Sequence, residues 1–376
     1  MRILVIASSY HPYKGGVETV VGDLVKGLNS QGDHAMIITN LWPKSLPLFE
    51  VLEGTAVFRV PMILPTQTGH NLVNWLKWLF TSVITSILVM CFKPQVINIQ
   101  CVGPNGYLGR RLGQTFQIPI VVSTHGERTN DSSGFYDSDL NLTMFNSLVD
   151  VASSVVCVSE VSAAETLKGI ETRTASVRII PNAITVTREK DECKERDIDI
   201  VFVGRMVKEK GVETLVRAIS LLRNDFINIK VHLIGDGPCA SQINTLISDV
   251  GLGNQITFLG QLERDAVSDE LLRSKILVLP SRKESFGLVL LEAANAGCAV
   301  VATATGGIPS IIDHGTNGLL FEVDSHEQLS IHLQSLLSDS DKRTKLVANF
   351  DMRLPLYDVS TFIERYKSVF LEVTQV

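Results

Sequence analysis

The chain has 376 residues, of which 45% are hydrophobic and 20% charged, a composition typical of an ordered globular protein large enough for two domains. Its formal net charge of −6 excludes the generally basic surface with which proteins bind nucleic acid. The six cysteines are scattered without a C-x-x-C pair, which indicates buried thiols in a reducing compartment and predicts a cytoplasmic protein.

The first half of the chain alternates short apolar runs with helix-like segments. The N-terminal run R-I-L-V-I-A ends at Tyr10, His11 and Pro12, so it predicts a buried strand rather than a signal peptide. Further strand-like runs are H-A-M-I-I-T, A-V-F-R-V, Q-V-I-N-I-Q, I-P-I-V-V-S-T, S-S-V-V-C-V-S and V-R-I-I-P-N. This alternation is typical of buried parallel strands whose connecting helices cover both faces of the sheet.

One segment, residues 75–92, is nearly long and apolar enough to span a membrane. Lys77 and four Ser/Thr residues interrupt it, and Pro94 follows it, so we predict a buried or interfacial helix instead. Trp75, Trp78 and Lys77 lie together at one end, an arrangement that would suit a peripheral membrane contact through the first domain.

The second half repeats the alternation after a break. Residues 188–197, R-E-K-D-E-C-K-E-R-D, are dense in charge and lack apolar periodicity, which indicates a linker or domain edge. The following strand-like runs are I-D-I-V-F-V-G, I-K-V-H-L-I-G, Q-I-T-F-L-G, K-I-L-V-L-P and A-V-V-A. We therefore predict two similar α/β domains, and a closing amphipathic helix near Val359–Val373. Ligands of open parallel sheets bind at the carboxyl ends of the strands, which is where motifs carry most meaning.

Two glutamates flank a predicted helix start in K-E-S-F-G-L-V-L-L-E, residues 283–292. The strand before this stretch and the helix-forming run after it place Glu284 before the helix and Glu292 on its second turn. Eight helical residues rise about 12 Å, whereas the two carboxylates of a retaining glycosidase lie roughly 5–5.5 Å apart. The layout suits an elongated ligand with hydroxyls at both ends and phosphate over the helix N-terminus, as in a nucleotide-diphosphate sugar. A solvated Glu284 and a surface-paired Glu292 form the alternative interpretation.

Three further motifs fall at predicted strand ends. Arg205 and Lys210, in V-F-V-G-R-M-V-K-E-K-G, could neutralise a diphosphate, although loops are often charged for no such reason. Gly15 and Gly16 precede a helix and would let backbone approach an anion closely, and a plain tight turn would also explain them. His125, in V-S-T-H-G-E-R, follows a strand and is either a cleft residue or a structural histidine.

The stretch G-D-G-P-C-A, residues 235–240, matches the glycine pattern of a dinucleotide-binding turn. Pro238 has no N–H to offer a pyrophosphate, and the next strand, Q-I-T-F-L-G, does not end in an acid. The stretch is therefore a weak signal for NAD binding.

Together these motifs resemble retaining glycosyltransferase family four, in the order of that family and over most of the chain. The residues that carry the resemblance are Gly15-Gly16-Val17-Glu18, His125-Gly126, Pro181-Asn182, Gly204-Arg205, Lys210-Gly211, Gly235-Asp236-Gly237-Pro238, Glu284-Ser285-Phe286-Gly287 and Glu292. The resemblance implies the GT-B architecture, in which two Rossmann-like domains face a central cleft. It assigns residues 1–185 to an acceptor-binding domain, 186–355 to a nucleotide-sugar-binding domain, and 356–376 to a helix that returns to the first domain.

The resemblance also implies roles for individual residues. Arg205 and Lys210 would stabilise the departing diphosphate, Glu284 would contact hydroxyls of the donor sugar, and His125 would lie beside the sugar being transferred. Glu292 would bind ribose, and backbone near Leu262 would border the base. The remaining donor-binding positions are Gly15, Gly16, Ser285, Phe286, Gly287 and Leu288.

The function implied is retaining transfer of a hexose from a nucleotide-diphosphate sugar to a hydroxyl of a glycan or lipid-linked acceptor, in polysaccharide or glycolipid biosynthesis. The expected enzyme needs no metal or other cofactor and works in the cytoplasm, at the inner face of the membrane if residues 75–92 make contact there. The alternatives are a sugar-nucleotide epimerase or phosphorylase of the same fold, and a catalytically silent sugar-nucleotide-binding protein.

Overall fold

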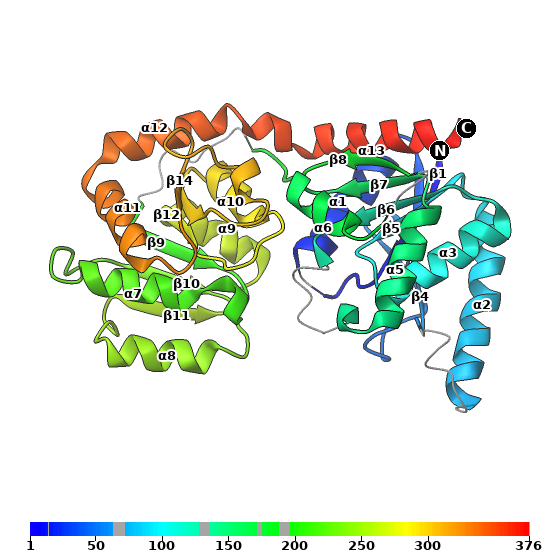
Figure 1. Ribbon diagram of the computed structural model, residues 1–376, viewed down its shortest axis with the longest axis horizontal. Coiled ribbons are helices and arrows are strands. Elements are labelled where there is room, and N and C mark those ends of the chain that lie inside the picture. The colour runs from blue at the N-terminus through cyan, green and yellow to red at the C-terminus, as the bar shows by residue number, and fades with distance from the viewer. Residues whose placement is uncertain (14, 63–71, 128–134, 171–174, 188–195, 376) are drawn as a thin grey trace. The chain divides into compact units, whose positions relative to one another are not determined.

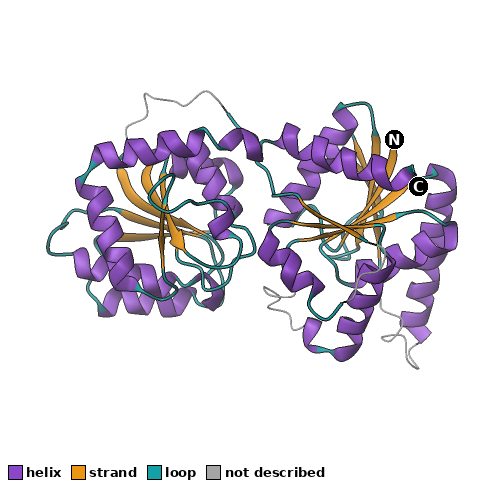
Figure 2. Ribbon diagram, turned by 45° about the horizontal axis from the view of Figure 1, so that its top comes forward, coloured by secondary structure: helices purple, strands orange, loops and turns teal. Residues whose placement is uncertain are grey.

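The computed structural model describes residues 1–13, 15–62, 72–127, 135–170, 175–187 and 196–375. The chain divides into two compact units, one comprising residues 1–182 and 359–376 and the other residues 183–358 (Figure 1). In each unit, helices cover both sides of a central sheet (Figure 2). Most of the charged segment predicted as a linker, residues 188–195, lies outside the described residues. Its last two positions, Arg196 and Asp197, belong to the second unit.

The first unit contains an eight-stranded sheet in the order β3-β4-β2-β1-β5-β6-β7-β8. Its strands are β1 (Arg2–Ala7), β2 (His34–Asn40), β3 (Phe49–Leu52), β4 (Thr55–Val60), β5 (Val96–Gln100), β6 (Ile120–Thr124), β7 (Ser154–Cys157) and β8 (Ser176–Ile179). Neighbouring strands are parallel except for the antiparallel β3–β4 pair. The helices are α1 (Gly16–Ser30), α2 (Leu72–Phe92), α3 (Pro104–Phe116), α5 (Asp139–Val151) and α6 (Glu160–Leu167). Strands β5, β6 and β7 are buried throughout, and β1 is buried except for Arg2, which explains their continuous apolar runs.

The predicted closing helix is confirmed as α13 (Val359–Thr374), which packs on α1 of the first unit. Gly27 of α1 makes this close approach feasible, because a Cβ there would lie 1.8 Å from Cδ1 of Ile363. Lys367 Nζ lies 2.9 Å from Asp33 Oδ2, and Arg178 Nη2 lies 2.7 Å from Glu372 Oε1. The helix is therefore held to the first unit both by its apolar face and by charged contacts at its flanks.

The second unit contains a six-stranded, wholly parallel sheet in the order β11-β10-β9-β12-β13-β14. Its strands are β9 (Ile198–Val203), β10 (Val231–Ile234), β11 (Ile256–Gly260), β12 (Ser274–Leu279), β13 (Ala299–Thr303) and β14 (Leu319–Phe321). Its helices are α7 (Val212–Leu222), α8 (Ala240–Asp249), α9 (Arg264–Arg273), α10 (Leu288–Asn295), α11 (His326–Ser338) and α12 (Ser340–Asp351). The two parallel-sheet units confirm the predicted Rossmann-like α/β class.

Each sheet reverses its strand order at one position, which defines where a ligand is expected. In the first unit the order reverses between β1 and β5, and in the second between β9 and β12. Loops that leave the carboxyl ends of two such strands diverge and leave room for a ligand between them. The loops that follow β9 and β12 contain most of the predicted donor-binding residues.

Candidate functional site

The loops after β9 and β12 bring two predicted site residues into direct contact. Lys210 Nζ lies 2.6 Å from Glu284 Oε2, and the two side chains are only 23% and 12% exposed. The Ser281 hydroxyl donates to the same carboxylate oxygen at 3.3 Å. The two residues are 74 positions apart in the sequence. Their charge-assisted hydrogen bond joins two loops at the topological switch point of the second sheet.

Glycine at two positions allows the loops around this pair to pack backbone against backbone. Gly306, after β13, has a φ of +53°, and a Cβ there would lie 1.7 Å from the carbonyl oxygen of Glu284. The N–H of Gly307 donates to that same oxygen at 3.0 Å. Gly211, with a φ of +59°, also lies against backbone, because a Cβ there would lie 2.2 Å from the carbonyl oxygen of Pro280. The backbone of Glu284 is therefore fixed by a neighbouring loop.

The glycine pattern of residues 235–240 has a packing explanation. A Cβ at Gly235 would lie 1.9 Å from the Gly204 carbonyl oxygen, and one at Gly237 would lie 2.6 Å from that of Met206. Met206 N donates to Asp236 O at 2.9 Å, which joins the loops after β9 and β10. These glycines let two strand-end loops meet, so their spacing needs no dinucleotide to account for it.

Arg205 extends from the loop after β9 into solvent. Its neighbour Met206 is completely buried and anchors the loop, whereas Arg205 is exposed. Among the residues that the structure describes, no carboxylate forms an ion pair with its guanidinium. Arg205 is thus a cation at a strand's carboxyl end whose charge is available to a ligand.

The prediction that a helix begins between Glu284 and Glu292 is confirmed by α10, which begins at Leu288. Gly287 is the N-cap of α10, with a φ of +94° and no side chain to cap the helix. Leu290 N donates to Gly287 O at 2.9 Å, so the N–H groups of Leu288 and Val289 are those that could face a ligand. Phe286 is buried and packs near Tyr357, with ring centroids 6.2 Å apart. Ser285 and Leu288 flank this turn and are partly buried, and Glu292 lies on the second turn, also partly buried. Leu262 lies in the loop after β11, two strands away from β9.

The first unit places His125 directly after β6, beside the end of β5. The ring Nε2 lies 2.8 Å from Oε1 of Gln100, the last residue of β5. Burial lowers the pKa of His125 to about 4, and the Asn182 side chain only partly offsets this effect, so the imidazole is neutral at pH 7. The other ring nitrogen, Nδ1, is buried and has no hydrogen-bond partner among the described residues, and the same holds for Oδ1 of Asn182.

Glu127, which was not among the predicted site residues, holds two loops of this region together. Its two carboxylate oxygens accept from Val102 N at 2.8 Å and from His125 N at 2.7 Å, so it joins the loops after β5 and β6. Burial raises the pKa of Glu127, and the backbone donors act against that rise. An acidic residue two positions after a strand-end histidine was the available sequence signal.

Gly15 and Gly16 lie where α1 begins, after β1. Gly15 is the N-cap and Gly16 the first helical residue, and both are exposed. A Cβ at Gly15 would lie 2.6 Å from Glu18 Oε2, whereas a Cβ at Gly16 would meet nothing within 4 Å. The fold itself therefore does not require glycine at position 16.

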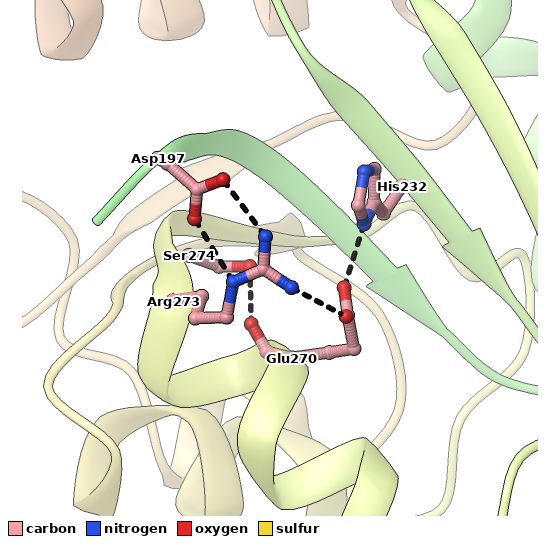
Figure 3. Close-up of polar contacts among 5 residues, drawn as sticks. All are labelled: Asp197, His232, Glu270, Arg273 and Ser274. Atoms are coloured by element: carbon pink, nitrogen blue, oxygen red, sulfur yellow. Dashed lines mark hydrogen bonds and ion pairs between the residues drawn. The ribbon is translucent and has the colours of Figure 1, made fainter. Parts of the chain in front are cut away.

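A second polar cluster, shown in Figure 3, lies at the amino ends of the strands of the second sheet, whereas the candidate site lies at their carboxyl ends. Arg273 forms two hydrogen bonds with Asp197, of 2.9 and 2.8 Å, and Glu270 Oε2 lies 2.6 Å from His232 Nδ1. The guanidinium of Arg273 lowers the pKa of the Asp197 carboxyl. Asp197 immediately precedes β9 and Arg273 immediately precedes β12, so the cluster ties α9 to the amino ends of these strands, away from the candidate site.

Solved structures with this arrangement are glycosyltransferases of the GT-B type. Sucrose-phosphate synthase from Thermosynechococcus elongatus matches with a TM-score of 0.81 and 20% identity, over 99% of this chain and 98% of that one. The HepE protein of Anabaena, solved in complex with UDP, matches with a TM-score of 0.78 and 19% identity, over 99% of this chain and 100% of that one. The fold is therefore GT-B.

Two family profiles divide the sequence between them. The profile "Glycosyltransferase Family 4" matches residues 14–188, and "Glycosyl transferases group 1" matches residues 184–351. The two profiles together cover residues 14–351. The chain therefore belongs to glycosyltransferase family four and is a glycosyltransferase of the GT-B type.

Curated relatives cover nearly the whole chain. An uncharacterised glycosyltransferase of Methanocaldococcus jannaschii is 26% identical over 367 residues, which is 93% of this chain and 92% of the relative. The gpi3 subunit of phosphatidylinositol N-acetylglucosaminyltransferase from Schizosaccharomyces pombe is 25% identical, over 89% of this chain and 72% of the relative. A GDP-mannose-dependent phosphatidylinositol monomannoside mannosyltransferase of Mycobacterium tuberculosis is 22% identical, over 92% of both.

Proposed function

We propose that this protein transfers a hexose, with retention of anomeric configuration, from a nucleotide-diphosphate sugar to a hydroxyl of a glycan or lipid-linked acceptor in polysaccharide or glycolipid biosynthesis. The observation that carries the proposal is the partly buried Lys210–Glu284 pair at the switch point of the second sheet. Arg205 and the open N-terminus of α10 lie in the same set of strand-end loops. The names of the relatives support hexose donors and lipid acceptors, and UDP was bound in a structural neighbour.

The residues of the second unit fit the charges that develop during such a transfer. Negative charge grows on the departing diphosphate, where Arg205, Lys210 and the first-turn N–H groups of α10 would stabilise it without a metal ion. Glu284 would accept hydrogen bonds from hydroxyls of the donor sugar, and Glu292 from the ribose. Phe286, Gly287 and Leu288 would present backbone to the donor, and Leu262 would border the base.

Retention without a protein nucleophile is the mechanism we favour. Glu127 is the carboxylate nearest to His125 in sequence, and both of its oxygens accept backbone N–H bonds. We therefore propose that the leaving group departs and the acceptor attacks on the same face of the sugar.

Replacement of either member of the ion pair tests the site. Glu284→Ala and Lys210→Ala should each reduce release of nucleoside diphosphate from the preferred donor by on the order of 100- to 1,000-fold while the protein remains folded. Lys208→Ala removes an equal charge from the exposed start of the same short 3₁₀ helix and should leave the rate unchanged. Full activity in either of the first two variants would reject the site.

The donor itself can be found by thermal shift with a panel of UDP-, GDP- and ADP-sugars. A ligand that binds only the native state raises its stability by about 2.7 kcal/mol at a hundredfold excess over the dissociation constant. Isomerisation of the donor sugar without release of nucleotide would instead indicate an epimerase, and pyridoxal absorbance of the purified protein a phosphorylase. Binding of a donor without turnover on a broad acceptor panel would indicate a silent binding protein.

Helix α2 supports an acceptor presented at a membrane, because its polarity is inverted. Its buried residues are Thr81, Ser82, Thr85 and Val89, whereas nine of its large apolar side chains are exposed and only Ile84, Leu88 and Phe92 pack partly buried against the core. The exposed side chains are Leu72, Val73, Trp75, Leu76, Leu79, Phe80, Val83, Ile87 and Met90. By length and composition α2 is also the one helix of the described residues that could cross a bilayer.

Contacts with the first unit argue that α2 lies on a membrane rather than across it. The Thr81 hydroxyl donates to Pro61 O at 2.8 Å, and Arg111 donates to Ser82 O and to the Thr85 hydroxyl at 3.2 Å each. These bonds tie the polar face of α2 to the domain. The opposite face is apolar, and α2 has no acidic residue and one cation, Lys77, which is partly buried and lies beside Trp75 and Trp78 in the sequence. An apolar face with a cation near its end suits the interface of an anionic bilayer. We propose that the protein works in the cytoplasm at the inner face of the membrane.

Flotation with vesicles of phosphatidylcholine and phosphatidylglycerol tests this contact. The chain should float with anionic vesicles, and Trp75→Ala combined with Trp78→Ala should weaken binding several-fold. Trp42→Ala, at an exposed tryptophan after β2, serves as the control and should have no effect. Absence of flotation would reject the membrane contact, and dimers that the double variant abolishes would assign the same face to a second copy of the chain.

A further inference from the structure

A chain of buried hydrogen bonds connects α13 to His125 through the carboxyl ends of β5 and β6. Tyr366 of α13 donates to the Ser123 hydroxyl at 3.1 Å, and Asn98 Nδ2 donates to that hydroxyl at 2.9 Å. Gln100 Nε2 donates to Asn98 Oδ1 at 2.6 Å, and Gln100 Oε1 lies 2.8 Å from His125 Nε2. Asn98 and Gln100 are completely buried, so every one of these polar groups depends on its protein partners.

The orientation of both amides follows from one backbone group. Asn98 Nδ2 lies 3.1 Å from the Val121 carbonyl oxygen, which can only accept, so the nitrogen of the Asn98 amide must face it. The Asn98 oxygen then faces Gln100 and can only accept, which requires the Gln100 nitrogen on that side. The Gln100 oxygen is left facing His125. Turning either amide over would bring two acceptors together in a buried site.

We infer that Gln100 is a positioning residue that holds His125 as the Nε2–H tautomer, so that the ring offers the lone pair of Nδ1 to a substrate hydroxyl. Because its oxygen can only accept, the ring nitrogen facing it must carry the proton of the neutral imidazole. Nδ1 is then an acceptor, and it is buried without a hydrogen-bond partner among the described residues. His125 would therefore orient a hydroxyl and not protonate the leaving group.

Asn182 offers the competing arrangement. Its Oδ1 is buried without a hydrogen-bond partner among the described residues, and its side chain interacts with the His125 ring. A proton on Nδ1 could bond to that oxygen and would remove the acceptor from the site. The bond from His125 to Gln100 is formed at 2.8 Å, and the Asn98 and Tyr366 groups behind it keep the amide from turning. Gln100 thus decides between the two tautomers.

Tyr366 connects this arrangement to the closing helix. Its ring packs between Phe362 and Phe370, with centroid distances of 4.8 and 5.7 Å, so the hydroxyl has a fixed position. Burial raises the pKa of Tyr366 to about 12, against the effect of Ser123 and Gln100, so the phenol stays neutral and can donate. Tyr366→Phe would remove that hydroxyl while keeping the packing of α13.

The tautomer can be measured without any substrate. In the full chain labelled with ¹⁵N-histidine, long-range ¹H–¹⁵N correlations at pH 7 distinguish a protonated from an unprotonated ring nitrogen. The chain has eight histidines, so the spectrum of a His125→Gln variant identifies the signals of residue 125. We expect a proton on Nε2 and none on Nδ1. A proton on Nδ1 in the unmodified chain would overturn the inference.

Variants of Gln100 test its part in the selection. Gln100→Leu should move the proton of His125 toward Nδ1 and Asn182, whereas Gln100→Glu retains an acceptor and should keep the proton on Nε2. Gln114→Leu, on the exposed face of α3, is the control and should change nothing. An unchanged tautomer in folded Gln100→Leu would reject the positioning role. Should that variant not fold, Gln100→Glu decides, because an anionic acceptor must raise the titration midpoint of His125.

The catalytic consequence rests on the proposed function. Gln100→Leu should lower kcat/KM for the donor by on the order of 10- to 100-fold, the loss typical when the hydrogen-bond partner of a metal-bound histidine is removed. Gln100→Glu should recover part of the loss. If the chain transfers no sugar at all, the proposed function fails while the tautomer measurement still stands. If transfer occurs and Gln100→Leu leaves it intact, the positioning role fails instead.

Discussion

Gly306→Ala should inactivate the enzyme by displacing Glu284, which is distant from Gly306 in the sequence but packs against it through its backbone. A Cβ at position 306 would lie 1.7 Å from the Glu284 carbonyl oxygen, and real Cβ contacts essentially never fall below 3.0 Å. The loop that carries Glu284 must therefore retreat by about 1.3 Å. A misplacement of about 1 Å can lower the rate of a positioned reaction by on the order of 100-fold.

The stability cost of Gly306→Ala has three parts. A left-handed backbone costs a non-glycine residue about 1–2 kcal/mol, and loss of the hydrogen bond from Gly307 N to Glu284 O adds about 0.5–1.5 kcal/mol. These two parts together amount to about 1.5–3.5 kcal/mol, and the collision adds strain to them, so we expect the free energy of unfolding to fall by at least that amount.

Gly315→Ala supplies the matched control. Gly315 also has a positive φ, +77°, but a Cβ there would meet nothing within 4 Å. It should show only the backbone cost of about 1–2 kcal/mol and retain full transferase activity. Urea unfolding and initial rates of nucleotide release, measured on both variants, separate backbone strain from displacement of Glu284. Equal stability and equal activity in the two variants would refute the reasoning.

Three further outcomes are expected. Gly16→Ala should keep or slightly raise the free energy of unfolding, since the space around Gly16 is open and alanine favours a helix over glycine by up to about 1 kcal/mol. The same variant should lower the rate of donor turnover at least tenfold if phosphate approaches the Gly16 backbone. Full turnover would show that Gly16 serves only the turn before α1. Ile363→Ala should lower the free energy of unfolding by about 2–5 kcal/mol. Adding Gly27→Ala should restore part of this loss, because the new methyl group occupies the space that the Ile363 side chain vacates. If the effects of the two substitutions on urea unfolding simply add, the contact between Gly27 and Ile363 is contradicted. Because the folded pKa of His125, about 4, lies below the ordinary 6.5, the unfolded chain takes up the proton first, and stability should fall by up to about 3 kcal/mol as the pH drops through this window. The raised pKa of Glu127 acts in the opposite direction, so the readout is the difference between the unmodified chain and His125→Gln, which should flatten the profile.

Most of the fold could be predicted from the sequence because buried parallel strands leave a local signal. The strands around β1 and β9 are apolar runs, and helix-forming segments separate them. β3 (Phe49–Leu52) gave no comparable signal, because this four-residue edge strand alternates exposed and partly buried positions. The orientation of α2 was equally hidden. Whether Thr81 or Leu79 faces the domain depends on Pro61 and Arg111, which are distant in sequence.

The identity of the candidate residues was accessible from the sequence, but their contacts were not. Strand ends and helix starts indicated Arg205, Lys210 and Glu284, since local patterns mark both features. The pairing of Lys210 with Glu284 depends on the crossover that places β12 beside β9, which no local pattern encodes. The same holds for Gln100 and Tyr366, whose role emerges only when α13 packs on the first sheet.

The Lys210–Glu284 ion pair gives the two cations of the candidate site, Lys210 and Arg205, different roles. Lys210 already has a carboxylate 2.6 Å away, so its charge is largely compensated until a diphosphate competes with Glu284 for it. Arg205 is exposed and has no ion-pair partner among the described residues, so it supplies the field that a diphosphate meets first. Arg205→Ala should therefore raise KM for the donor most at low salt, because added salt screens an exposed charge, whereas Lys210→Ala should lower kcat at every ionic strength. A salt-independent effect of Arg205→Ala on kcat alone would show that the two cations do not divide the work in this way.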